Sequence, residues 1–82
     1  MNKPYLVRAE WDAGVGVWVG TSDDVPGLVT EAQTIEALDA KLKHIVPELL
    51  QANGCMPADG QVMIELLARR LCIAQPLGCL DR

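Results

Sequence analysis

The chain of 82 residues has no phenylalanine, one histidine and three cysteines, and each scarcity narrows the chemistry open to it. Without phenylalanine the core has to be largely aliphatic, with one tyrosine and two tryptophans as the only large rings. The cysteines are Cys55, Cys72 and Cys79. Their spacing matches no zinc or redox motif and His44 is the only histidine, so we predict reduced thiols and neither a metal site nor a cofactor.

Long hydrophobic runs and clusters of positive charge are also missing. No run approaches the roughly 18 to 20 apolar residues of a membrane span, and the first residues lack the apolar core of a signal peptide. We therefore predict a cytoplasmic protein with no membrane contact. The net charge is −4, from 11 acids and 7 bases, and Arg69-Arg70 is the only adjacent basic pair. This balance disfavours DNA or RNA as a direct ligand and suits a basic protein partner better.

Residues 22–34 separate two strand-like runs from one helical pattern. Asp23-Asp24 followed by Pro26-Gly27 predicts a turn, because proline presets φ and glycine accepts a positive φ. The hydroxyl of Thr34 is suited to cap the helix that follows. The residues expected to act in this turn and cap are Pro26, Gly27 and Thr34.

Alternation of apolar and polar residues predicts three strands before the helix. The first covers residues 4–12, and one of its faces carries Tyr5, Val7, Ala9 and Trp11. A glycine-containing turn leads to a returning strand over residues 17–22, and residues 28–31 form a short third strand. Within the second strand, Gly20 indicates either a bulge or a close backbone approach.

From residue 34 the apolar period changes to that of an amphipathic helix of about five turns. Its apolar stripe consists of Ile35, Leu38, Leu42, Ile45 and Leu49. Asn53-Gly54 predicts the end of the helix. Pro47 predicts a kink or a division into two shorter helices, because it removes one backbone hydrogen bond.

Residues 61–68 alternate again and predict a fourth strand, although residues 65–70 also have helix propensity. The predicted fold is therefore α+β, with the order β-β-β-α-β and one long helix packed on one face of an antiparallel sheet. Residues 1–68 are expected to form a single domain. Residues 69–82 are expected to form an apolar tail that packs on this domain or reaches a partner.

No arrangement of side chains in the sequence predicts catalysis, and we expect no enzyme. Asp23 and Asp24, with Asp12 near them, are more typical of turns than of a paired-carboxylate site, so a diverged metal-dependent hydrolase is the least favoured hypothesis. Trp18 is either a core residue or an exposed anchor at a protein interface. The strand register, which the sequence does not fix, decides whether Trp11 faces it. The candidate partner-binding residues are Trp18, Asp23, Asp24, Arg69 and Arg70.

The residues around the Pro-Gly turn resemble a known family. Residues 16–19 lead to Asp24-Val25-Pro26-Gly27-Leu28-Val29-Thr30-Glu31-Ala32, and Thr34-Ile35-Glu36-Ala37-Leu38 opens the helix. This order of elements, over residues 5–54, resembles the N-terminal domain of HicB-type antitoxins. The closest likeness is to a HicB-related family of small bacterial domains of unknown function.

The resemblance implies a β-β-β-α-β domain, likened to a partial ribonuclease H fold, that forms dimers or larger homo-oligomers. It also implies a partner, because HicB-type antitoxins mask a small basic mRNA-cleaving toxin, HicA. Many of these antitoxins carry a C-terminal DNA-binding segment, for which the residues after Ala68, broken by Pro76 and Gly78, are too few. Direct DNA binding is therefore not expected.

Besides the diverged hydrolase, two hypotheses about function follow from the sequence. The first is a non-enzymatic, HicB-like protein-interaction domain that serves as the antitoxin of a type II toxin-antitoxin pair. The alternative is a stand-alone small-ligand-binding module, in which Tyr5, Trp11 and Trp18 surround a shallow apolar pocket.

Overall fold

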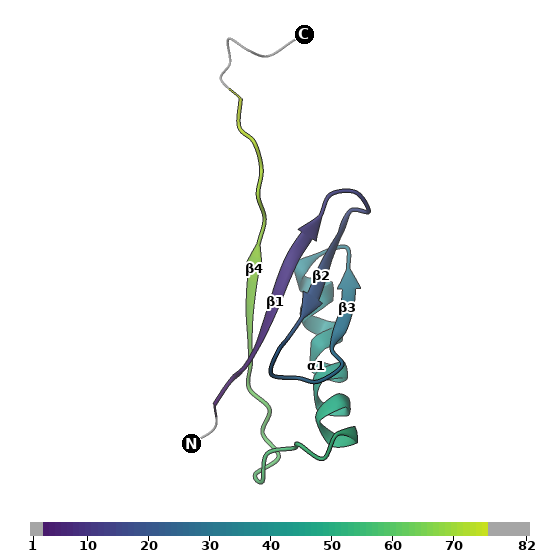
Figure 1. Ribbon diagram of the computed structural model, residues 1–82, viewed down its shortest axis with the longest axis vertical. Coiled ribbons are helices and arrows are strands. Elements are labelled where there is room, and N and C mark those ends of the chain that lie inside the picture. The colour runs from purple at the N-terminus through teal and green to yellow at the C-terminus, as the bar shows by residue number, and fades with distance from the viewer. Residues whose placement is uncertain (1–2, 76–82) are drawn as a thin grey trace.

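The chain folds into a four-stranded sheet with one helix against one of its faces (Figure 1). The computed structural model describes residues 3–75. The elements are β1 (Tyr5–Asp12), β2 (Val17–Thr21), β3 (Val29–Ala32), α1 (Ile35–Ala52) and β4 (Ile64–Arg69). The predicted α+β class and the β-β-β-α-β order are therefore confirmed.

The last strand runs parallel to β1, so the sheet is mixed and not antiparallel throughout. The strand order is β3-β2-β1-β4. β2 is antiparallel to both β1 and β3, whereas β4 is parallel to β1. β3 points the same way as β1, and α1 then brings the chain back across the sheet, so the next strand again points in that direction (Figure 1). One helical crossover thus makes β4 a parallel strand.

The core lies between α1 and the first three strands. Val7 and Ala9 of β1 face the helix and are fully buried. Gly20 is the register partner of Ala9 on β2, and a Cβ atom on it would lie 3.4 Å from Leu38 Cδ1. Gly20 therefore permits a close approach of the helix, in an unbroken register without a bulge. The buried hydrophobic residues are Val7, Ala9, Val25, Leu28, Ala32, Leu38, Leu42, Val46 and Leu50.

The helix begins and ends at the residues expected, but it is not divided. Thr34 is the N-cap residue, and its Oγ1 accepts a hydrogen bond of 3.0 Å from the backbone N–H of Ala37. Asn53 is the C-cap residue. α1 continues through Pro47 as one helix of 18 residues. Of the two predicted alternatives, the division into two helices is therefore wrong, and the kink stays a prediction. Val46 and Leu50, both fully buried, pack on the sheet on either side of the proline and compensate for the hydrogen bond it removes.

β4 lies outside the region that α1 covers, and the chain continues beyond it. The strand starts later than the predicted residue 61 and ends at Arg69. Residues 70–75, called the arm here, run on in extended form past the end of β1 (Figure 1). On the arm, Leu71 is 80% exposed and Ile73 is 89% exposed. The predicted division between a domain and a tail stays a prediction, and the part of the tail from residue 76 onward lies outside the described residues.

Candidate functional site

A cluster of two tryptophans and an arginine lies at the hairpin end of the sheet. Trp11 and Trp18 are register partners in β1 and β2. Their rings meet edge to face, with centroids 5.4 Å apart and planes at 62°, an arrangement favoured by the ring quadrupoles. The guanidinium of Arg70 lies 4.5 Å from the centroid of the Trp11 ring, which is within the range of a cation–π contact. Both rings are half-buried. Through Arg70, this cluster connects the first residue of the arm to β1 and β2.

The acidic turn, residues 22–27, lies at the opposite end of the sheet. Two of its side chains form hydrogen bonds with the backbone of β1. Asp24 Oδ2 accepts a hydrogen bond of 2.8 Å from the backbone N–H of Leu6. The hydroxyl of Ser22 donates to the backbone oxygen of Leu6 and accepts from the N–H of Asp24 at 3.0 Å. Two side chains thus satisfy both backbone groups of Leu6, just beyond the point where the β1–β2 ladder ends at Arg8 and Thr21.

Asp23 differs from Asp24 because it remains largely free to meet a partner. Its only contact described here is an ion pair of 3.3 Å with Arg8, and the Asp23 side chain is 89% exposed. An ion pair this exposed contributes little to stability. The turn that follows has the geometry expected of its residues, since the N–H of Leu28 donates to the oxygen of Val25 at 3.2 Å and Gly27 has a φ of +83°.

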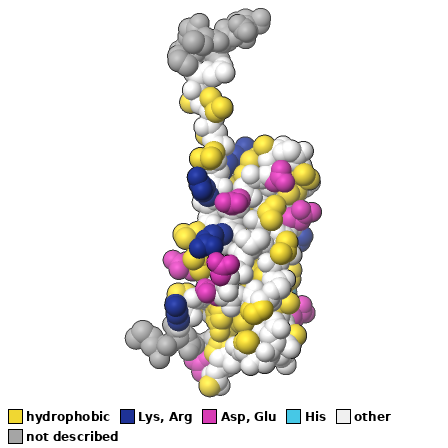
Figure 2. Space-filling model, in the orientation of Figure 1, with side chains coloured by type: hydrophobic (Ala, Val, Ile, Leu, Met, Phe, Trp, Pro, Cys, Tyr) yellow, Lys and Arg dark blue, Asp and Glu magenta, His cyan; other side chains and the backbone are white. Residues whose placement is uncertain are grey.

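Nothing within residues 3–75 forms a covering layer over the face of the sheet opposite α1. Alternation along the strands places Arg8 and Glu10 of β1 on this face, together with Glu65, Leu67 and Arg69 of β4. Figure 2 shows acidic and basic side chains alternating along β1 and β4, with hydrophobic side chains beside them. This helix-free face therefore presents a mixed surface of both charge signs and apolar groups.

Exposed apolar side chains are concentrated on β4, on the residue before it and on the arm. Seven large hydrophobic residues are exposed among the described residues, and four of them lie between residues 63 and 73. These four are Met63 at 55%, Leu67 at 53%, Leu71 at 80% and Ile73 at 89% exposed. The other three exposed large apolar side chains are scattered along the chain, so this line of four is the candidate interaction surface.

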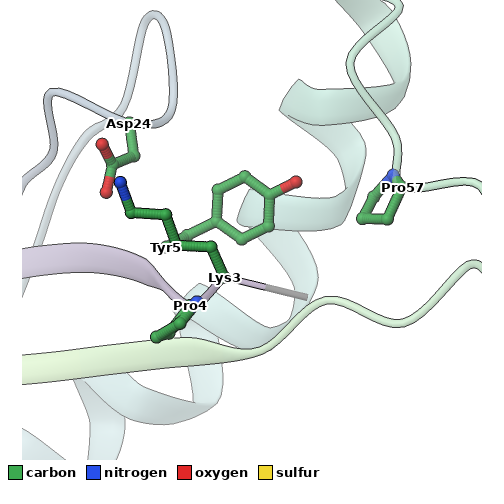
Figure 3. Close-up of a pocket in the computed structure, with 5 residues that line it drawn as sticks. All are labelled: Lys3, Pro4, Tyr5, Asp24 and Pro57. Carbon is green, nitrogen blue, oxygen red and sulfur yellow. The ribbon is translucent and has the colours of Figure 1, made fainter. Parts of the chain in front are cut away.

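A shallow pocket of about 270 Å³ lies beside the start of β1. It is lined by Lys3, Pro4, Tyr5, Asp24 and Pro57. Figure 3 shows the ring of Tyr5 between Pro57, which follows α1, and the charged side chains of Lys3 and Asp24. Tyr5 lies at the opposite end of β1 from Trp11, about 20 Å away at the usual rise of a strand. The three large rings therefore do not surround one pocket.

The structure separates the five predicted partner-binding residues. Trp18 and Arg70 both contact Trp11 at the hairpin end. Asp23 and Asp24 lie at the other end, and Arg69 lies on the helix-free face. Sequence reasoning did not single out Met63, Leu67, Leu71 and Ile73 as surface residues, although all four occupy odd positions and so share one face of an extended chain.

The remaining candidate chemistry is limited to isolated groups. Asp12 is the last residue of β1. Its Oδ1 accepts from the N–H of Gly14 in the hairpin turn at 3.0 Å, at the end of the sheet away from Asp23 and Asp24. Within residues 3–75, no group of three or more histidine, cysteine or acidic residues is arranged to hold a metal ion. Cys55 and Cys72 are exposed free thiols, and Cys79 lies outside the described residues. In the same part of the chain, no helix has the length and apolar character required to cross a membrane.

A mixed four-stranded sheet with a single helix on one face defines a small α+β domain. Its candidate binding groups lie on the outer surface and in shallow pockets. The chain belongs to the family described as a domain of unknown function (DUF1902), whose sequence model matches residues 4–75. It is similar to the hypothetical protein TTHA1013 from the extremely thermophilic bacterium Thermus thermophilus, whose crystal structure is known. The two are 47% identical over 92% of this chain and 97% of that chain, with a TM-score of 0.68. Among curated proteins, none matches this chain.

The family match extends beyond the predicted resemblance, which covered residues 5–54. Residues 4–75 include β4 and the arm. These two segments are therefore part of the family's shared sequence and not an addition to it.

Proposed function

We propose that this chain is a non-enzymatic protein-interaction domain and that it acts as a cytoplasmic antitoxin of the HicB type. The observation that carries the interaction role is the line of exposed apolar side chains along β4 and the arm, among them Leu67, Leu71 and Ile73. Apolar surface of this kind is normally buried against a partner. Of the two acids in the turn, Asp24 has a structural task, whereas the exposed Asp23 is free to bind a partner and supports this role.

The antitoxin role is supported by charge and by the resemblance of the Pro-Gly region to HicB-type domains. The net charge of −4 suits a basic partner, because complementary charge speeds and orients docking. The partner of this proposal is a small basic ribonuclease like HicA. The chain would inhibit it by covering its active surface, so no bond is made or broken by the antitoxin itself.

The test is to purify the tagged full-length chain from its native host at low salt and to identify any protein present in equal amount. A small basic protein that cleaves RNA alone, and stops cleaving when this chain is added, is the expected result. Inhibition should weaken in Asp23→Lys and persist in Glu36→Lys, which reverses an exposed acid in the first turn of α1, at the end of the helix away from the acidic turn. The antitoxin role would be contradicted if no basic protein is purified with the chain. It would also be contradicted if the chain does not inhibit RNA cleavage by the basic protein that is purified with it.

The pocket at Tyr5 favours a second candidate function, a small-ligand-binding module. Its volume of about 270 Å³ is just below the usual range for ligand sites, roughly 300 to 1,000 Å³, so only a small molecule fits. A cation, an anion and an aromatic ring line it, from Lys3, Asp24 and Tyr5. A panel of small zwitterions should then include one that raises the melting temperature of the native chain and not of Tyr5→Ala. If no compound does so, this second function is wrong.

A further inference from the structure

The outer edge of β4 carries a row of backbone groups that face away from the sheet. The N–H of Tyr5 donates to the oxygen of Met63 at 2.8 Å, and Tyr5 is the register partner of Ile64. In a parallel ladder this pattern turns the backbone groups of Glu65, Leu67 and Arg69 toward β1. The N–H and C=O groups of the residues between them therefore point outward, which is the template that an edge strand offers to another strand. These residues are Ile64, Leu66 and Ala68.

The opposite edge of the sheet is shorter and is partly closed. β3 has four residues, against six in β4. The ammonium group of Lys41, on α1, donates to the backbone oxygen of Glu31 at 2.6 Å and so occupies one acceptor of β3. β4 is therefore the edge more open to a further strand.

The side chains on the helix-free side of β4 form a pattern that is complementary to itself. In order they are Glu65, Leu67 and Arg69 of β4, with Met63 just before the strand and Leu71 on the arm after it. Counting outward from Leu67 in either direction gives a charged residue and then an apolar one. The two charged residues have opposite signs. When two copies of this strand run antiparallel, apolar residues therefore face apolar residues and each charge faces its opposite.

We propose that β4 pairs antiparallel with β4 of a second copy of this chain, about a twofold axis that passes beside Leu67. In this register Glu65 lies opposite Arg69 of the partner subunit, and Met63 lies opposite Leu71 of the partner subunit. The same two contacts recur on the other side of the axis, as an isologous interface requires. The two four-stranded sheets then join into one continuous sheet, and the first residues of each arm lie along the partner.

The backbone geometry agrees with this register. Because the N–H and C=O of Leu67 face β1, Leu67 meets its symmetry mate as a non-hydrogen-bonded pair, in which side chains are closest. Leu66 and Ala68 of the partner subunit then exchange both backbone hydrogen bonds. The apolar contact and the two ion pairs therefore fall at the positions where cross-strand side chains interact most strongly.

Neighbouring registers lose the complementarity. An axis beside Glu65 places that carboxylate opposite its own copy, and an axis beside Arg69 does the same with two guanidinium groups. An axis beside Leu66 sets Glu65 against a leucine, and Met63 against an arginine. Of these axes, only the one beside Leu67 pairs, on the helix-free side, every apolar residue with an apolar one and every charge with its opposite.

This inference names one partner of the interaction domain proposed above and rests on that proposal only in taking β4 as a binding edge. Its first test is sedimentation equilibrium of the full-length chain. We expect a dimer that dissociates on dilution, and a dissociation constant about 30-fold higher or more in Leu67→Lys, because two like charges then meet at a central contact. Val29→Lys is the matched control, since Val29 is 75% exposed on the edge strand β3, and it should leave the dimer unchanged.

The ion pairs give a test of the register itself. Glu65→Arg places arginine opposite arginine twice in each dimer and should raise the dissociation constant about tenfold. Glu65→Arg combined with Arg69→Glu restores opposite charges across the axis and should recover most of that loss. The recovery is incomplete because Glu10 is the register partner of Arg69 within the subunit, so the new carboxylate meets a like charge there.

Amide hydrogen exchange gives an independent readout. Raising the protein concentration should slow exchange at Leu66 and Ala68, whose N–H groups point outward, and should leave Glu65 and Leu67 unchanged. A chain that stays monomeric at about 100 μM, well above the micromolar range of a specific complex, would overturn the proposal. So would a dimer that Leu67→Lys does not weaken, or an assembly that grows beyond two copies, which indicates head-to-tail pairing of β4 with β3. If the chain is monomeric but a basic toxin is purified with it, this inference is wrong and the proposed function is still supported.

Discussion

β1, β2, β3 and α1 are called the helix-covered half here. Its three strands form one sheet with β4, but this half and β4 are stabilised in different ways. Every buried hydrophobic side chain of the described residues lies in the helix-covered half or in the turn at Val25 and Leu28. None of the six residues of β4 is buried. β4 is attached through its backbone ladder to β1, together with partly buried contacts from Ile64 and Leu66. Packing in the core accounts for the apolar residues of the helix-covered half, whereas the 53% exposed side chain of Leu67 in β4 is not accounted for by packing within one subunit.

The comparison is tested most strongly by removing one leucine from each part. Leu42→Ala deletes a side chain that is 1% exposed and should lower the free energy of unfolding by about 2 to 5 kcal/mol, through lost transfer energy and the cavity left behind. Leu67→Ala, at 53% exposed, should change it by less than about 0.5 kcal/mol. Chemical denaturation at low protein concentration measures both values for the monomer. Equal losses in the two variants would show that β4 belongs to the core after all.

A second variant tests how closely α1 approaches the sheet. Gly20→Val adds a branched side chain where even a Cβ would lie 3.4 Å from Leu38, and overpacking should cost about 1 to 3 kcal/mol. Thr21→Val is the control, because it places the same side chain one residue later, on the exposed face of β2. Thermal unfolding of the two variants should differ clearly, and similar melting temperatures would contradict the close approach.

A third variant concerns the side chains that end the β1–β2 ladder. Asp24→Ala leaves the N–H of Leu6 without its 2.8 Å acceptor and should cost about 1.5 kcal/mol, the value for a hydrogen bond to a charged group. Asp23→Ala removes an ion pair whose side chains are 58% and 89% exposed and should cost less than about 0.5 kcal/mol. The ratio of the two effects, from denaturant midpoints, separates the structural acid from the available one. A larger loss in Asp23→Ala would reverse their roles.

The smallest effect is expected where the arm meets the helix-covered half. Arg70→Ala removes the cation–π contact with Trp11 and should cost about 0.5 kcal/mol. The change in tryptophan fluorescence should be more evident than the change in stability, because the guanidinium leaves the ring face. Arg69→Ala is the control, since Arg69 precedes Arg70 directly and lies on the helix-free face. An identical fluorescence change in both variants would show that Arg70 does not rest on the ring.

The sequence was informative where a local pattern and a buried face agree. The period of two in residues 5–12 and the helical stripe from Ile35 onward both predicted elements that exist, and Thr34 and Asn53 mark the ends of α1 as expected. The division of the helix that Pro47 predicted as one of two alternatives does not occur, because the local cost of the proline is outweighed by the burial of Val46 and Leu50 in the core. The parallel direction of β4 was also missed, since it depends on which edge the chain reaches after the helix and not on the residues of the strand.

The surface was less predictable than the core for a physical reason. A tryptophan or an acid in a short sequence does not reveal which end of a sheet it will occupy, so Trp18 and Asp23 were grouped although they lie at opposite ends. The contact between Trp11 and Trp18 required the register, which depends on pairing across the hairpin. The pattern from Met63 to Leu71 has meaning only once β4 is known to be an edge strand.

The pairing of Tyr5 with Ile64 also has a consequence for how the protein folds. It joins the first strand of the chain to the last, so the loop that must close is nearly the whole domain, and long-range pairings of this kind form slowly. The hairpin, the short third strand and the helix can assemble from nearby segments before β4 reaches its place. During that interval β1 is itself an unpaired edge, which makes the late arrival of β4 the step at which a folding chain is most open to pairing with the wrong strand.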